Sequence, residues 1–295
     1  MSHIPVLLKE VMSYLNPKSG DFIIDGTFGE GGYTNEILKA VDGKGTVLAV
    51  DLSPVAIKNG KDKFRNEIMS GNLIFKQGNF SELGESFMSP LIEKADGLVL
   101  DLGFSSSEVE DYGRGFSFMR DEPLLMTYDD SKEPLKDALR RLKKDEIEKI
   151  LRDYSGERFA RKIAESIWET QKKKPIETTF ELVDAVKKTL PRNYEMGRIH
   201  PATRTFLAFR IFINDELGTL EKILRDSGHI LKPGGRMVVV SFQSLEDKIV
   251  KDEFKNIEKT GVGKILTKKP IPPNRKEILE NRRSRSAKLR ALEIL

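Results

Sequence analysis

The sequence predicts an α/β fold in which a doubly wound sheet is interrupted by an inserted helical domain. Short apolar runs alternate with amphipathic stretches as far as residue 101, and the alternation returns after residue 200. Between these parts, from about Glu108 to Ile199, helical patterns occur without strands. The first apolar run leads directly into a cluster of glycines, which is typical of the first strand–helix turn of such sheets.

The glycine cluster lies between a predicted strand and a predicted helix. Phe22–Ile24 is short, apolar and bounded by turn residues, which favours a buried parallel strand that ends at Asp25. Glycines follow at positions 26, 29, 31 and 32, and Tyr33–Val41 has the apolar spacing of a helix. Glycine permits close approach of a ligand, and the helix start offers free N–H groups to an anion. A merely structural turn explains the glycines equally well at this point.

The second predicted strand ends in another carboxylate. Thr46–Val50 is apolar and leads to Asp51, about twenty residues after the glycines. A carboxylate at this place can accept hydrogen bonds from both ribose hydroxyls of a nucleoside. Thr34 stands where a dinucleotide-binding loop requires its third glycine. The loop therefore favours S-adenosylmethionine (SAM), which has an adenosine and an amino-acid carboxylate but no pyrophosphate.

A third carboxylate, Asp101, follows the fourth predicted strand. The further elements expected in this part are a helix over residues 8–15, a helix from Pro54 to about Ile68 capped by Ser53, and strands at Leu73–Phe75 and Asp96–Leu100. Because parallel strands end at one edge of a sheet, we expect Asp25, Asp51 and Asp101 to lie together beside the glycine loop.

The central part of the chain is expected to form a helical domain that covers the cofactor site and shapes a substrate cleft. Helices are predicted at Leu135–Leu151, Arg158–Trp168 and Phe180–Leu190, with Pro175 and Pro191 as breaks. The expected domain boundaries are residues 1–106 for the first part of the sheet domain, 107–199 for the helical insert and 200–295 for the second part.

The last part of the chain opens with a predicted long helix. Its apolar stripe has steps of three and four residues and consists of Phe206, Phe209, Ile213, Leu217, Leu220 and Leu224. A Pro-Gly-Gly turn follows, then a strand at Arg236–Phe242 and a helix at Leu245–Phe254. Ala291–Leu295 is expected to be an edge strand.

Composition excludes several classes of chemistry. The 295 residues include no cysteine, so disulfides, cysteine–zinc sites and thiol nucleophiles are excluded, as is thiol-dependent methylation of a pyrimidine carbon. The three histidines lack the spacing of metal ligands, and we expect no metal. No apolar run has the length of a membrane span and no leader is apparent, so we expect a cytoplasmic protein without a membrane partner.

Charge is concentrated near the C-terminus. Residues 264–290 contain ten Lys or Arg and two Asp or Glu, a local charge of +8 in a chain whose net charge is +4. A basic segment of this kind favours binding to a polyanion such as RNA. A solvated, merely structural charged face remains the alternative.

These motifs together resemble the bacterial 16S ribosomal RNA (cytosine N4)-methyltransferase family over nearly the whole chain. The matching stretches are His3–Val11, Asp25–Gly32, Asp101–Ser106, Arg114–Phe118, His200–Arg204, Gly234–Arg236, Ser241–Val250 and Asn281–Arg290. The resemblance implies a class I methyltransferase, with a Rossmann-like sheet, that uses SAM to methylate N4 of a decoding-centre cytidine. It also implies 16S rRNA or the small ribosomal subunit as partner, and it leaves a homodimer open.

The resemblance also implies site residues. The SAM contacts would be Gly29, Gly31, Gly32, Tyr33, Asp51, Phe80, Asp101 and Glu108. Asp101 is the candidate catalytic residue, as an acceptor for the cytosine amine, and the candidate RNA contacts are Arg114, Arg204, Arg282, Arg283 and Arg285. The sequence departs from the family pattern at Tyr33, Glu108, Leu125, Thr127, Tyr128, Ser155, Gly156, Gln243 and Arg282.

Two other functions fit parts of the sequence. A nicotinamide- or flavin-dependent oxidoreductase would use the loop and Asp51, but it leaves Asp101 and the basic segment unexplained. A ribosome-assembly factor without catalytic activity would keep the fold and the RNA contacts. Binding of SAM and transfer of its methyl group distinguish the three functions.

Overall fold

The computed structural model describes residues 5–84, 94–102, 113–191, 193–194 and 199–295. The chain divides into two compact units. The first, the sheet unit, comprises Met1–Ser107 and Leu217–Leu295, and the second, the helical unit, comprises Glu108–Glu216. The second boundary therefore lies after residue 216, whereas the sequence placed it after residue 199.

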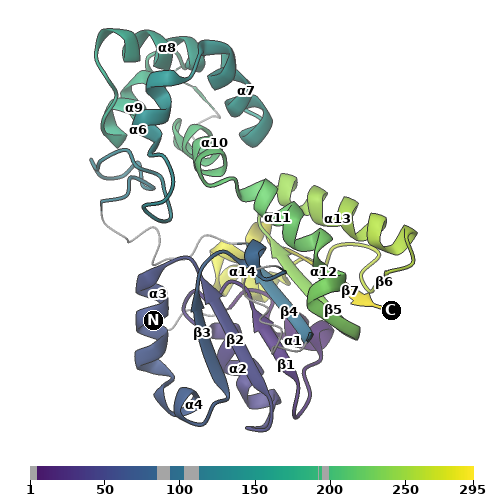
Figure 1. The fold of residues 1–295 in the computed structure, drawn as a ribbon. Helices are drawn as coiled ribbons and strands as arrows, with labels where there is room; N and C mark the ends of the chain where they lie inside the picture. Colours follow the sequence, from purple (N-terminus) through teal and green to yellow (C-terminus); the bar gives the residue numbers. More distant parts are fainter. Residues whose placement is uncertain (1–4, 85–93, 103–112, 192, 195–198) are drawn as a thin grey trace. The chain divides into compact units, whose positions relative to one another are not determined.

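The sheet unit contains seven strands in the order β3-β2-β1-β4-β5-β7-β6 (Figure 1). The strands are β1 Phe22–Asp25, β2 Thr46–Asp51, β3 Leu73–Gln77, β4 Ala95–Asp101, β5 Leu231–Ser241, β6 Gly263–Ile265 and β7 Lys288–Ile294. The first five are parallel, and β7 is antiparallel to β5 and β6. The strand order reverses between β1 and β4, the place where ligands bind in open sheets of this kind. The predicted α/β class is confirmed.

Helices cover both faces of this sheet, and strand residues alternate between them. Ile23 packs in a core with helices α1 Leu8–Leu15, α2 Gly32–Ala40 and α3 Pro54–Lys63. Its neighbour Ile24 packs in the core on the other face, under α11 Glu216–Arg225, α12 Ser227–Ile230 and α13 Ser244–Lys259. Strands buried on both faces account for the continuous apolar runs seen in the sequence.

Shorter elements complete the sheet unit. They are α4 Arg65–Met69, η1 Phe80–Glu82, α14 Arg275–Glu280 and η3 Arg282–Ser286. The Ser53 hydroxyl accepts a hydrogen bond from the Ala56 N–H (3.2 Å), with Pro54 at the first helical position, so the predicted cap is confirmed. The helix ends at Lys63 rather than near Ile68, because Phe64 leaves helical geometry before α4 begins.

The helical unit has a core of its own. Its helices are α6 Leu135–Arg141, α7 Lys144–Ser155, α8 Ala160–Lys173, α9 Thr179–Lys187 and α10 Thr203–Asn214. The core comprises buried apolar residues from all five helices, among them Leu139, Leu151, Ile167, Val183 and Phe209. The predicted single helix at Leu135–Leu151 is two helices, because the backbone at Leu142 is extended.

The prediction of one long helix from residue 206 to residue 224 is wrong. Asp215 has a left-handed backbone (φ 51°) that ends α10, and α11 starts at Glu216. Phe206 packs in the core of the helical unit, whereas Leu224 packs under the sheet. The apolar stripe thus belongs to two helices, each of which packs in a different core. The boundary between the helical unit and the sheet unit therefore lies after Glu216.

The prediction that the C-terminal strand lies at an edge is also wrong. β7 pairs with β5 on one side and with β6 on the other, and β6 is the edge strand. The burial of β7 agrees with this interior position, since Leu289, Ala291 and Leu292 are fully buried. In the part of the chain that the structure describes, no helix is long and apolar enough to cross a membrane.

Candidate functional site

Three aspartates end adjacent parallel strands of the sheet unit. Asp25 ends β1, Asp51 ends β2 and Asp101 ends β4. β1 pairs with both other strands, and Asp25 stands opposite Ala49 of β2 and Val99 of β4. The predicted gathering of these carboxylates at the carboxyl edge of the sheet is confirmed, on both sides of the point where the strand order reverses.

The glycine loop is tied to the second of these carboxylates. The Gly29 N–H donates to Asp51 Oδ2 (2.7 Å), and the Ser53 N–H donates to Asp51 Oδ1 (2.8 Å). Burial raises the pKa of Asp51, while these two hydrogen bonds act in the opposite direction by stabilising the charged form. The carboxylate is therefore held in place, and each oxygen keeps a further lone pair for a ligand.

The glycines at positions 31 and 32 also have a packing role. Gly31 has a left-handed backbone (φ 74°), and a Cβ there would lie 2.6 Å from the Phe28 ring. A Cβ on Gly32 would overlap the Pro5 side chain. The sequence left open a structural or a ligand-binding reason for these glycines, and the structure supplies the structural reason at both positions.

Asp25 is the most deeply buried of the three carboxylates. Its side chain accepts a hydrogen bond from the Thr34 hydroxyl (2.6 Å) and a longer one from the Thr27 N–H (3.3 Å). Burial raises its pKa from 3.8 to about 6, against the effect of both hydrogen bonds and with a small contribution from the charge of Asp51. A carboxylate in such surroundings is stabilised by any cationic group placed beside it.

Asp101 is connected to the loop and to the start of α2. Its backbone N–H donates to the Thr27 hydroxyl (2.7 Å). The Tyr33 hydroxyl donates to the Val6 carbonyl oxygen and lies near enough to Asp101 for the two groups to interact electrostatically. Burial first, and then the charges of Asp101, Asp25 and Glu277, raise the pKa of Tyr33 well above its ordinary value of 10. Tyr33 therefore stays a neutral hydrogen-bond donor.

Of the two remaining predicted cofactor contacts, Phe80 belongs to the same edge. Phe80 begins η1 after Asn79, whose side chain accepts from the Ser81 N–H (2.9 Å). Phe80 lies beside the glycine loop, since a Cβ built on Gly26 would be 3.4 Å from Phe80 Cβ. Glu108 lies outside the residues that the structure describes.

Two residues of the site were not predicted from the sequence. Thr27 joins Asp25 and Asp101, and its place inside the glycine loop was the signal that could have identified it. Glu277 lies on α14 and accepts from the Leu7 N–H (2.6 Å). No local pattern indicates that pairing, because the two residues are 270 positions apart.

The predicted RNA contacts have two kinds of surroundings. In the helical unit, Arg114 donates to the Thr127 carbonyl and hydroxyl oxygens (both 3.2 Å) and to Asp130 (2.9 Å). Arg204 lies half-buried on α10 of the same unit. In the sheet unit, Arg282, Arg283 and Arg285 are all exposed on η3.

The end of the basic segment has a structural role. Arg290 pairs with Asp247 through Nε (2.7 Å), and Lys288 reaches the same carboxylate (3.0 Å). These ion pairs join β7 to α13 and lower the pKa of Asp247, against the effect of its burial. Part of the +8 charge therefore stabilises the fold, whereas the arginines of η3 are exposed to solvent.

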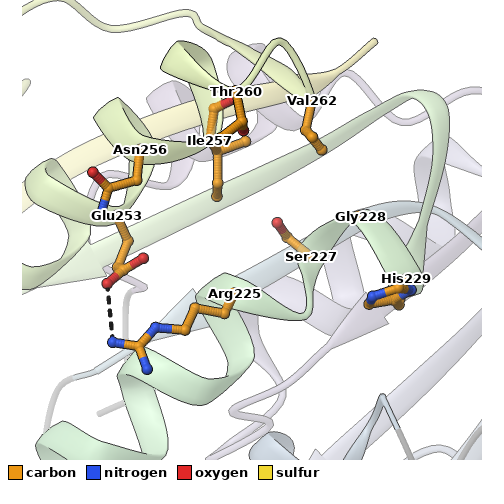
Figure 2. A pocket seen from close by; sticks show the side chains of 9 residues that line it. All are labelled: Arg225, Ser227, Gly228, His229, Glu253, Asn256, Ile257, Thr260 and Val262. Carbon is orange, nitrogen blue, oxygen red and sulfur yellow. Dashed lines mark hydrogen bonds and ion pairs between the residues drawn. The ribbon is translucent and has the colours of Figure 1, made fainter.

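A pocket of about 380 Å³ lies elsewhere in the sheet unit (Figure 2). Its lining includes Ser227 and His229, which directly precede β5, so the pocket is at the amino end of that strand. Asp101 lies at the opposite edge, where β4 and β5 end side by side. In the lining of the pocket, the Arg225 guanidinium faces Glu253 (3.3 Å), as Figure 2 shows. This pocket is therefore separate from the three aspartates.

Comparison with known proteins identifies the family. The model of the MraW methylase family matches residues 1–295. "Ribosomal RNA small subunit methyltransferase H" of Acetivibrio thermocellus is 42% identical over 307 aligned positions, covering 99% of this chain and 98% of the relative. The protein of the same name from Wolbachia pipientis subsp. Culex pipiens is 43% identical and is covered, like this chain, over 100%. A SAM-dependent O-methyltransferase structure from Thermotoga maritima aligns with a TM-score of 0.45 and 11% identity, covering 100% of this chain and 68% of that one. On its full-length match, the chain belongs to the MraW methylase family.

Proposed function

We propose that this protein transfers the methyl group of SAM to the exocyclic N4 of a cytidine in 16S ribosomal RNA. The observation that carries the proposal is the row of strand-end carboxylates beside a glycine loop, in a chain that matches the MraW methylase family over its whole length. Relatives more than 40% identical over the full length are named as small-subunit rRNA methyltransferases, which supports rRNA as the substrate.

The residues at the carboxyl edge fit SAM. Asp51 has acceptor capacity for the ribose hydroxyls, and Phe80 offers an apolar ring to the adenine from beside Gly26. Asp25 is a buried carboxylate whose charged form gains from a neighbouring cation, and SAM carries both a sulfonium and an ammonium group. When bound, SAM supplies a methyl group on a positively charged sulfur that leaves as a neutral thioether.

Asp101 is proposed to act on the nucleophile. The lone pair of the cytosine amine is conjugated into the ring, so the amine is a poor nucleophile. A carboxylate that accepts a hydrogen bond from one N–H group of the amine favours a more pyramidal nitrogen. The lone pair of that nitrogen can then form the new N–C bond. The proton becomes acidic once the nitrogen is alkylated, and Asp101 is the proposed acceptor for it. A strong base is therefore not required. Holding the amine and the methyl group in line lowers the activation free energy by several kcal/mol.

On the sheet unit, we propose that the protein binds the phosphates of the RNA and does not recognise its bases. The η3 sequence alternates arginine with serine, and no aromatic side chain occurs in it. Exposed arginines of this kind contact phosphates and release counterions. We propose that the helical unit, with Arg114 and Arg204, recognises the substrate. Because the proposed substrate is rRNA, we also propose that the reaction takes place in the cytoplasm.

Methyl transfer from labelled SAM to small ribosomal subunits tests the proposal directly. Nucleoside analysis of the digested RNA should show N4-methylcytidine, formed by the wild-type chain and much more slowly by Asp101→Asn. Label on another atom would refute the assigned chemistry. Binding of SAM and RNA without any transfer would instead show a ribosome-assembly factor.

A further inference from the structure

Strand β1 leaves the sheet before its neighbour β4 ends. Asp25 stands opposite Val99 in the parallel register, so the same register would place position 27 opposite Asp101. The ladder continues for one bond beyond β1, from the Gly26 N–H to the Val99 carbonyl (2.9 Å), and the chain then turns into the glycine loop. The Asp101 N–H therefore needs an acceptor other than the backbone of a continuing strand.

A side chain supplies that acceptor. The Thr27 hydroxyl accepts the Asp101 N–H at 2.7 Å, at the short end of the range for an N–H···O bond. The backbone is fixed on both sides of Thr27, because the Gly26 N–H donates to β4 and the Phe28 N–H donates to the Val50 carbonyl of β2 (2.9 Å). Threonine is branched at Cβ, which restricts its first side-chain torsion. Thr27 thus presents its hydroxyl oxygen at a well-defined point.

The next bond along β4 is of a different kind. The Leu102 N–H donates to the Val240 carbonyl of β5 (2.9 Å), a bond between backbone groups that a change of side chain does not remove. The end of β4 at Asp101 is thus held to β5 by the backbone and to the glycine loop by the Thr27 hydroxyl. A substitution at position 27 can therefore move this strand end relative to the loop.

Thr27 also contacts the carboxylate that ends β1. Its N–H donates to Asp25 Oδ1 (3.3 Å), and the Thr34 hydroxyl, near the start of α2, donates to Asp25 Oδ2 (2.6 Å). Hydrogen bonds therefore connect α2 through Asp25 and Thr27 to Asp101. All four residues belong to the sheet unit. The loop proposed to hold SAM and the carboxylate proposed to accept the cytosine amine are thus connected at Thr27.

We propose that Thr27 is a positioning residue for Asp101, whose carboxylate it holds where the cytosine amine is in line with the methyl group of SAM. The proposal rests on the catalytic role proposed for Asp101. Alignment of two reacting groups is sensitive to small displacements, since a shift of about 1 Å can slow a reaction about a hundredfold. Thr27 acts through the backbone of Asp101 and needs no contact of its own with either reactant.

Thr27→Val keeps the shape of the side chain and replaces its hydroxyl with a methyl group. A methyl carbon cannot accept a hydrogen bond and packs at roughly 3.5 Å or more from its neighbours, so the end of β4 must move. At saturating SAM and RNA, we expect the single-turnover rate to fall about tenfold, the effect of one lost hydrogen bond, while SAM affinity stays within about threefold of wild type. Thr27→Ser keeps the hydroxyl and should restore most of the rate. Thr27→Ala, which also removes the acceptor, replaces the valine variant if that chain does not fold.

Thr267→Val is the matched control. The Thr267 hydroxyl accepts the Ala291 N–H of β7 (3.0 Å), so this substitution removes the same kind of hydrogen bond. β5 separates β7 from β4 in the sheet. Both valine variants should therefore lose thermal stability, but only Thr27→Val should lose methylation rate. Equal losses of rate in the two variants would indicate general damage to the sheet and would overturn the inference.

Two further measurements test whether Thr27 acts through Asp101. Added to Asp101→Asn, the Thr27→Val substitution should slow the reaction little further, because the carboxylate that it positions is already lost. Hydrogen–deuterium exchange, resolved to single residues and measured without SAM or RNA, reports the contact itself. Exchange at the Asp101 N–H should be faster in Thr27→Val than in wild type, and unchanged in Thr267→Val.

Several outcomes overturn the inference. They are a wild-type rate in Thr27→Val, a full additional loss of rate in the double variant, wild-type exchange at the Asp101 N–H, and a loss of rate explained wholly by weaker SAM binding. If the wild-type chain methylates no cytidine, the proposed function is refuted. The exchange measurement then decides by itself whether Thr27 holds the end of β4.

Discussion

The carboxyl edge of the sheet and the C-terminal basic segment carry charge in opposite ways. At the edge, Asp25 is fully buried and its charged form is opposed by burial. In the basic segment, Arg282, Arg283 and Arg285 lie in solvent, where ions screen each charge. A single substitution at the edge should therefore have a large effect, whereas the exposed arginines act through their sum.

The basic segment repeats this contrast within itself. Arg290 is buried and paired with Asp247, and it joins β7 to α13. Arg285, five residues earlier, is exposed on η3. A run of like charges in a sequence can thus contain both structural ion pairs and a surface for a polyanion, and burial distinguishes them.

The largest effect is expected at Asp101. Asp101→Asn keeps the shape of the side chain and removes its charge where the amine should dock. The single-turnover rate should fall about a hundredfold, within the range of general acid–base groups, with SAM affinity changed only a few-fold. Rapid-quench methylation at saturating RNA and calorimetry with SAM provide the two measurements. A variant as fast as wild type would remove Asp101 from the chemistry.

The next effect concerns stability and pH at Asp25. Because its pKa is raised to about 6 in the folded chain, the folded state binds this proton more tightly than the unfolded state does. The resulting stability is complete below about pH 4 and is lost as the pH rises through about 6, a cost of about 3 kcal/mol. Asp25→Asn does not titrate, so its free energy of unfolding relative to wild type should rise by about that amount between pH 4 and pH 8.

Urea unfolding of both chains across this pH range, without SAM, checks the prediction at Asp25. Asp62→Asn, at an exposed position on α3, is the control and should show no comparable trend. A constant difference between Asp25→Asn and wild type would mean that burial does not hold the proton on this carboxyl.

A somewhat smaller loss is expected for cofactor binding at Asp51. Asp51→Ala removes the proposed acceptor for the ribose hydroxyls and leaves the N–H groups of Gly29 and Ser53 without their partner. SAM affinity should weaken by roughly 1–3 kcal/mol. Calorimetry on the folded variant measures this, and an unchanged affinity would exclude the ribose role.

The smallest effect per residue is expected on η3. Replacing Arg282, Arg283 and Arg285 by Gln should weaken binding to target and unrelated RNA alike. The slope of log affinity against log salt should flatten by about two units, since each phosphate contact contributes about 0.7–0.9. SAM affinity and thermal stability should not change.

The matched control for η3 removes three exposed positive charges elsewhere on the sheet unit. Lys248, Lys255 and Lys259 of α13 are replaced by Gln, and the salt slope should change much less. If the η3 variant lost thermal stability while its salt slope stayed the same, its arginines would be structural, like Arg290.

The sequence by itself determined the strands and the ends that carry chemistry. Each buried parallel strand is a short apolar run, because both of its faces are covered, and the residue that ends it is recognisable from the pattern. Asp25, Asp51 and Asp101 were therefore predicted at one edge, and the structure places them there. The Ser53 cap was predictable because its hydrogen-bond partner, Ala56, is only three residues away.

Only the tertiary structure decided which distant segments meet. The break at Asp215 divides one continuous apolar stripe between two cores, and periodicity cannot show that. The interior place of β7 depends on its pairing with β5 and β6, and the role of Arg290 depends on Asp247. The contact of Glu277 with Leu7 joins the two ends of the chain. Local patterns record burial along one element, whereas these features depend on contacts between residues far apart in the sequence.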